Sequence, residues 1–160
     1  MQLKLRQWDK NKNSVSVNYG PLTFSLLIKE DYKRRDSKET AIWDSRWQEN
    51  ADVTAWPSYE IFPASTWNYG LQVDANNLTK SFTIKKKPWP KGDDPFTNAN
   101  APIELIATGK QIPNWTIDQY GLCGVLPQSP VAVEGGPVKL TLVPMGGARL
   151  RISAFPVVNY

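Results

Sequence analysis

Prolines and glycines interrupt this chain so often that little room is left for long helices. The 160 residues include thirteen prolines and ten glycines, and no polar low-complexity linker separates them. Proline fixes φ and removes a backbone donor, so it ends helices and is excluded from central strands. About nine or ten short strands joined by turns are therefore expected, with no long helix and no internal repeat.

The alternation of apolar and polar residues indicates where these strands lie. Residues 3–8 and 15–19 predict a hairpin around an Asn- and Lys-rich turn, and residues 22–28 predict a well-covered central strand. Further strands are expected at residues 59–62, 70–74, 81–87, 103–108, 111–117, 138–143 and 148–154, the last two as a terminal pair. This pattern predicts an all-β fold, an antiparallel β-sandwich or jelly roll, forming a single domain over residues 1–160.

The charge and the scarcity of histidine and cysteine limit the chemistry. A net charge of +4 is weak evidence for an anionic partner. The basic residues 85–91 are interpreted as a solvated strand end, and no nucleic-acid partner is expected. With no histidine, and with Cys123 as the one cysteine, histidine triads and multi-cysteine zinc sites are excluded, and no metal or cofactor is expected. Cys123 is predicted to be an inert thiol.

Two further features of the sequence concern membrane insertion and secretion. No apolar run approaches the roughly 20 residues that a membrane-spanning helix needs, so no membrane span is expected. The first eight residues alternate polar and apolar side chains and do not have the pattern of a secretory signal. The sequence by itself therefore leaves the localisation open.

Seven tryptophans are the clearest oddity of the composition. A tryptophan ring that faces solvent can stack on a sugar, whereas a buried ring packs the core or an interface between domains. Residues 29–50 form a polar insertion or a short helix, which favours solvent exposure nearby. The candidates for carbohydrate binding are Trp43, Trp47 and Trp56. The candidates for corner packing or interdomain packing are Trp67, Tyr69, Trp89 and Trp115.

Carboxylates offer a third, enzymatic hypothesis. Two carboxyl groups held roughly 5 to 10 Å apart across a sugar could hydrolyse a glycoside. The candidates on strands or turns are Glu60, Asp74, Glu104 and Asp118. Each is also an ordinary solvent-facing residue, and the sequence does not give the distances between them.

Five short motifs occur in order along the chain. They are YGPLTFSL at residues 19–26, WNYGL at 67–71, IPNW at 112–115, LPQSPV at 126–131 and RLRISAFP at 149–156. Together they resemble the C-terminal β-sandwich region of the bacterial β-L-arabinofuranosidase-like glycoside hydrolases. The resemblance runs from about Trp8 to Val158. It departs from the family at Gly147, where many relatives have a cysteine.

The resemblance implies a parent protein whose active site lies elsewhere. In that family an (α/α)₆ barrel carries a catalytic glutamate and a nucleophilic cysteine at a zinc site, and none of these motifs occurs in this chain. The expected function is a non-catalytic accessory domain that packs on the barrel, in a parent that is periplasmic or extracellular. The alternative is a free-standing carbohydrate-binding module that uses exposed tryptophans on plant-type glycans.

Overall fold

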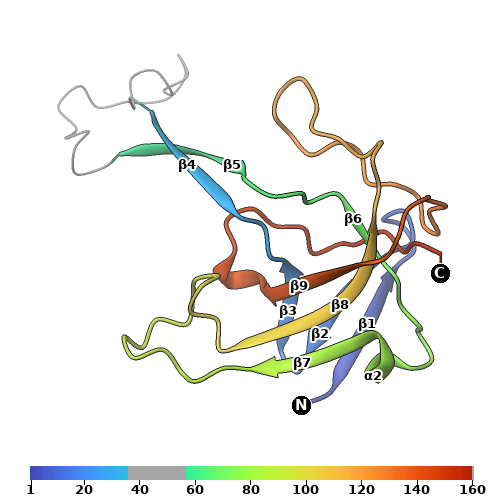
Figure 1. Ribbon diagram of the computed structural model, residues 1–160, viewed down its shortest axis with the longest axis horizontal. Helices are drawn as coiled ribbons and strands as arrows, with labels where there is room; N and C mark the ends of the chain where they lie inside the picture. The colour runs from blue at the N-terminus through green and yellow to red at the C-terminus, as the bar shows by residue number, and fades with distance from the viewer. Residues whose placement is uncertain (36–56, 160) are drawn as a thin grey trace.

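The computed structural model describes residues 1–35 and 57–159 and is built almost entirely of strands (Figure 1). The elements are β1 (Leu3–Trp8), β2 (Ser14–Tyr19), β3 (Leu22–Leu26), β4 (Glu30–Arg35), β5 (Ser58–Pro63), β6 (Tyr69–Leu71), α2 (Leu78–Ser81), β7 (Phe82–Lys86), β8 (Ile103–Gln111), β9 (Val138–Pro144) and the 3₁₀ turn η1 (Met145–Gly147). The predicted all-β, antiparallel fold is confirmed. No helix of the described ranges is both long and apolar enough to cross a membrane.

Seven strands form one antiparallel sheet that curls on itself. Its order is β1-β2-β3-β9-β8-β6, with β7 also paired to β8. The curl occurs at β3, whose first residues, Leu22 and Thr23, pair with β2, while Phe24 to Leu26 pair with β9. The hairpin β1–β2 is the one expected from the sequence. Its turn contains Lys12 and Asn13 at positive φ, as the Asn-rich sequence favours.

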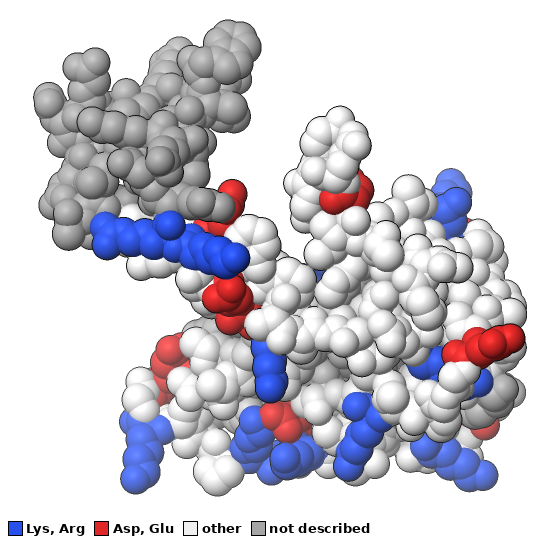
Figure 2. Space-filling model, turned by 45° about the horizontal axis from the view of Figure 1, so that its top comes forward, with Lys and Arg blue, Asp and Glu red and all other residues white. Residues whose placement is uncertain are grey.

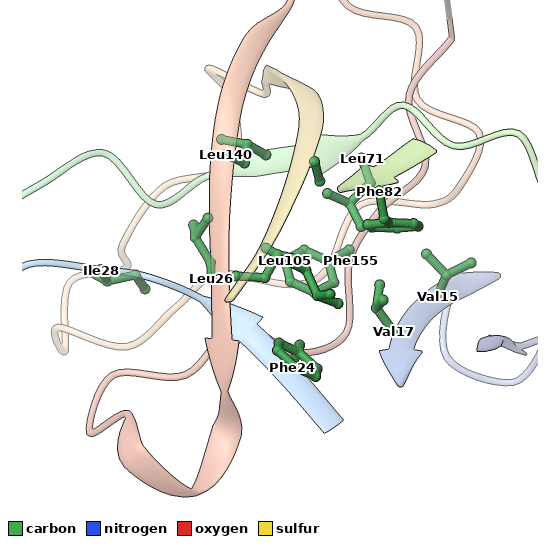
Figure 3. Packing of buried hydrophobic residues seen from close by; sticks show 12 residues of the cluster. Val15, Val17, Phe24, Leu26, Ile28, Leu71, Phe82, Leu105, Leu140 and Phe155 are labelled. Carbon is green, nitrogen blue, oxygen red and sulfur yellow. The ribbon is translucent and has the colours of Figure 1, made fainter. Parts of the chain in front are cut away.

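The concave side of the curled sheet holds the hydrophobic core (Figure 3). Val15 and Val17 of β2 face the same interior as Leu105 of β8, because residues two apart on a strand share a face. Phe24 and Phe155 are fully buried there. Phe155 does not belong to a strand of the sheet. It lies in the segment after η1, residues 148–159, here called the C-terminal segment, which therefore completes the core.

Two of the strands predicted from the sequence are absent from the described part of the chain. Residues 148–154 were expected as a strand paired with 138–143, but β9 pairs with β3 and β8, and 148–154 form no regular strand. Instead Val15 and Phe155 exchange two backbone hydrogen bonds, each 2.8 Å long. Residues 111–117 were also expected as a strand, but β8 ends at Gln111 and turns follow it. Local alternation could not show which distant segment would offer pairing groups.

Close backbone approach holds β6 against β8 and the C-terminal segment. A Cβ on Gly109 would lie 2.3 Å from the carbonyl oxygen of Gly70, and one on Gly70 would lie 2.4 Å from a methyl group of Val158. Only glycine fits at these two positions, because no side-chain atom tolerates such contacts. The short β6 is thereby fixed, and with it the preceding residues 67–68 that support the candidate site.

Strands β4 and β5 form a separate two-stranded arm that extends away from the curled sheet (Figure 1). Part of the polar insertion predicted at residues 29–50 is therefore strand β4. The arm begins at Glu30, two residues after Ile28, which is buried in the main core. Its position beside the C-terminal segment creates the groove described below.

Candidate functional site

A loop at residues 116–125, here called the apolar loop, projects beside the arm (Figure 1). Its large apolar side chains face solvent: Tyr120 is 77% exposed, Leu122 63% and Val125 82%. Figure 2 shows the loop as an almost uncharged projection with acidic atoms at its base. Clustered apolar exposure of this kind marks an interaction surface more often than single exposed residues do.

Asp118 fixes the conformation of the apolar loop. Its carboxylate oxygen Oδ1 accepts hydrogen bonds from the backbone N–H groups of Tyr120 and Leu122, both at 2.9 Å. Its own N–H donates to the carbonyl of Leu122 at 2.8 Å, and Gly121 adopts a positive φ that allows the tight reversal. The tip is therefore ordered although its side chains contact little of the body.

Trp115 anchors the apolar loop to the body. The ring is 3% exposed, and its Nε1–H donates to the carbonyl oxygen of Gly124 at 3.0 Å. Its edge packs against Trp67, with the ring centroids 5.0 Å apart. The amide of Asn68 donates to the carbonyls of Ile112 and Trp115, both at 3.0 Å. These contacts join the loop to the segment that leads into β6.

A groove of about 420 Å³ separates the apolar loop from the arm. Its apolar wall includes Ile117 and Tyr120 of the loop and Phe62 of β5, and Trp67 also contributes to it. Glu60 and Arg151 are the charged residues of its lining. Its further lining residues are Ile28, Ile61, Pro63, Gly121, Cys123, Leu150 and Ile152. This composition suits an apolar segment of another protein better than a strongly polar ligand.

Glu30 holds the base of the arm beside this groove. One oxygen of its carboxylate accepts the N–H groups of Arg149 and Leu150 at 2.9 and 3.1 Å, and the other accepts the Tyr32 hydroxyl at 2.6 Å. Partial burial by itself would raise the pKa of Glu30, but these hydrogen bonds together outweigh it and lower the pKa. Glu30 was not predicted as a site residue, because the two amides that it binds lie about 120 residues away in the sequence.

Cys123 lines the groove but does not have the surroundings of a nucleophile. Burial raises the pKa of its thiol, and the charge of Asp118 adds to the increase, although the contact with Trp115 opposes it. The thiol therefore stays protonated at neutral pH and lies 3.6 Å from the carbonyl oxygen of Gly124. Reactive cysteines require the opposite shift of the pKa.

The four carboxylates proposed for catalysis are not gathered in one cavity. Asp118 orders the apolar loop, and Asp74 accepts the N–H of Asn76 in a turn at 2.9 Å. Glu104 is buried on β8 and forms ion pairs with Lys85, at 3.5 Å, and with Lys87. Glu60 lines the groove between loop and arm, whereas Asp74 and Glu104 line other hollows.

The structure places four of the predicted aromatic residues in different surroundings. Trp67 and Trp115 pack against each other, and Tyr69 packs, partly buried, against the main core. Trp89 is 60% exposed in the loop after β7, where its Nε1–H donates to Asp93 at 2.6 Å. The three predicted carbohydrate-binding residues, Trp43, Trp47 and Trp56, lie outside the described residues.

The residues that dominate the apolar loop were not predicted as site residues. Tyr120, Leu122 and Val125 follow the strand expected at residues 111–117, and none of them was a candidate. The sequence could not show that they face solvent, because this depends on the turn that Asp118 holds in place. Among residues 1–35 and 57–159, no group of three or more acidic or cysteine side chains could hold a metal ion.

Comparison of the chain with family models, with curated proteins and with solved structures finds no match in any of the three.

Proposed function

We propose that this chain is a non-catalytic β-domain that supports a neighbouring protein domain by packing its apolar loop against it. The observation that carries this proposal is the exposure of Tyr120, Leu122 and Val125 on a loop that Asp118 and Trp115 hold rigid. A flexible loop would lose conformational entropy on binding, whereas a loop that is already ordered loses little.

The energy available from this surface is substantial. Complete burial of an apolar side chain of this size stabilises by about 1.5–3 kcal/mol. Because the three tip residues are between 63% and 82% exposed, most of that gain is still available to a partner. The groove beside the loop, with Phe62 and Ile117 in its wall, would enlarge the same contact.

The resemblance to the β-L-arabinofuranosidase-like glycoside hydrolases suggests which partner this is. In a protein of that kind the neighbouring domain is an (α/α)₆ catalytic barrel, and the apolar loop would fix how the β-domain sits on it. The protonated thiol of Cys123 and the structural roles of Asp118 and Glu104 support a role without catalysis in this chain.

The first test is the size of the native product in the source organism, measured by immunoblotting with an antibody against this domain. The proposal predicts a band several times larger than the 18.0 kDa of this chain. A band near 18.0 kDa would show that no barrel is attached, and the accessory-domain proposal would be wrong.

The second test places the contact on the apolar loop. In the native-length protein, Leu122→Asp should separate the thermal unfolding of the β-domain from that of its neighbour. Val138→Asp is a matched control, because Val138 is 38% exposed on β9 and does not belong to the loop or the groove. Equal effects of the two variants would exclude the loop as the docking surface.

A further inference from the structure

A second groove, of about 430 Å³, lies on the outer surface where β3 leaves β2. Strand β2 pairs with β3 only at Asn18 and Tyr19, near its end. Near its start, Val15 of β2 pairs instead with Phe155 of the C-terminal segment. The opening between these two neighbours is lined by residues of β1, β2 and β3 and by residues 11, 145, 153 and 154. It shares no lining residue with the groove beside the apolar loop.

An arginine stacked on a tryptophan forms one wall of this groove. Arg6 and Trp8 are two apart on β1 and therefore share its outer face, and the guanidinium carbon of Arg6 lies 3.7 Å from the centre of the Trp8 ring. The ring is fixed in turn, since its Nε1–H donates to the hydroxyl of Ser16 at 3.0 Å. A stacked guanidinium keeps its N–H edge available for a ligand.

The neighbouring strands β2 and β3 present polar groups that are also held in place. The amide of Asn18 donates to the hydroxyl oxygen of Thr23 at 2.8 Å, and Ser16 accepts from Trp8. Each of these two hydroxyls accepts one hydrogen bond and keeps its own proton to donate. Together with the guanidinium they make the groove rich in hydrogen-bond donors.

The charge of the groove is positive, because Arg6 is the charged residue of its lining. No acidic residue lines it, and across the two described ranges the guanidinium of Arg6 has no carboxylate or hydrogen-bond partner. The nearby Asp9 accepts a hydrogen bond from Gln7 at 2.9 Å. An arginine without an acidic partner, in a groove of donors, favours a planar anion that can accept two parallel hydrogen bonds.

We propose that this groove binds an acidic carbohydrate, a uronic-acid residue of an oligosaccharide. The carboxylate would accept hydrogen bonds from Arg6, the sugar hydroxyls would meet Ser16, Asn18 and Thr23, and the exposed part of the Trp8 ring would contact the apolar face of the sugar. The site lies on other elements than the apolar loop, so it does not depend on the proposed domain contact.

Titration calorimetry with two trisaccharides tests the proposal, one of galacturonic acid and one of neutral galactose with the same linkage. The acidic trisaccharide should bind at least tenfold more tightly than the neutral one. Arg6→Ala should abolish that preference, and Arg6→Lys should lose most of it because lysine cannot form the bidentate contact. Circular dichroism should show unchanged folding, since Arg6 is exposed on β1.

Lys4→Ala is the matched control, because it removes the same charge from the same strand but does not line the groove. It should leave the binding constant within about a factor of two. Equal binding of the two trisaccharides, no binding of either, or an equal loss in Lys4→Ala and Arg6→Ala would each overturn the proposal. Equal competition by inorganic phosphate at the same concentration would also overturn it, by showing that the site recognises an anion without its sugar.

Discussion

Replacing Trp115 by phenylalanine removes one hydrogen bond from the buried base of the apolar loop. An aromatic ring remains that can still pack against Trp67, so the substitution isolates the contact between Nε1 and the carbonyl of Gly124, 3.0 Å away. The chain offers a matched comparison. Trp89 also donates through Nε1, to Asp93 at 2.6 Å, but its side chain is 60% exposed.

Burial determines how much each substitution should cost. At Trp115, which is 3% exposed, the partly buried carbonyl of Gly124 loses its indole donor and keeps only the long contact with the Cys123 thiol, which costs about 1–3 kcal/mol. The smaller ring adds a partial cavity that costs on the order of 1 kcal/mol. The expected loss in the free energy of unfolding is therefore about 2–4 kcal/mol. At Trp89 water replaces the lost donor, and the loss should stay within about 0.5 kcal/mol.

Urea unfolding followed by far-ultraviolet circular dichroism measures both losses without relying on tryptophan fluorescence. For a slope of about 2 kcal/mol/M, a loss of 3 kcal/mol lowers the midpoint by about 1.5 M. The same loss lowers the melting temperature of a chain of this size by about 6–12 °C. Equal midpoints for Trp115→Phe and Trp89→Phe would refute the reasoning, because burial would then not determine the cost of the lost bond.

Three further outcomes follow from other contacts. The lowered pKa of Glu30 means that its contribution to stability is present above its ordinary value of 4.5 and is lost as the pH falls through the lower folded value. Exchange protection of the Leu150 amide should fall over that acidic range, and Glu30→Gln should remove the pH-dependent step. Gly109→Ala should destabilise by about 1–3 kcal/mol in urea, because its Cβ meets backbone at 2.3 Å, whereas Gly146→Ala, with nothing within 4 Å, should change stability by less than about 0.5 kcal/mol. Because its pKa is raised above the ordinary value of 9.0, Cys123 should react with iodoacetamide more slowly at pH 8 in the folded protein than in urea; faster reaction when folded would contradict this.

The fold could be predicted from the sequence where neighbouring residues decide the structure. The hairpin β1–β2 and the strands β5, β7 and β9 follow from alternation and from turn-forming residues. The prediction of a strand at residues 111–117 was wrong. Pro113 has no backbone N–H to donate, and a turn follows in which the N–H of Trp115 donates to the carbonyl of Ile112.

The candidate site was predictable only in part. Trp67 and Trp115 were predicted as residues of corner or interdomain packing, and they pack against each other at the base of the apolar loop, Trp115 buried and Trp67 partly buried. Glu30 gains its role from amides about 120 residues away in the sequence. Arg6 and Trp8 could be placed on one face of a strand, yet the groove beside them exists only because β3 leaves β2.

The sequence by itself determined that this protein consists of short antiparallel strands, because proline, glycine and the period of two act over a few residues at a time. Only the tertiary structure decided that Phe155 would complete the core, since the choice of a pairing partner depends on which distant segments closure of the sheet brings together. It also decided that Tyr120 and Leu122 face solvent, because a rigid turn held by Asp118 points them away from any core position.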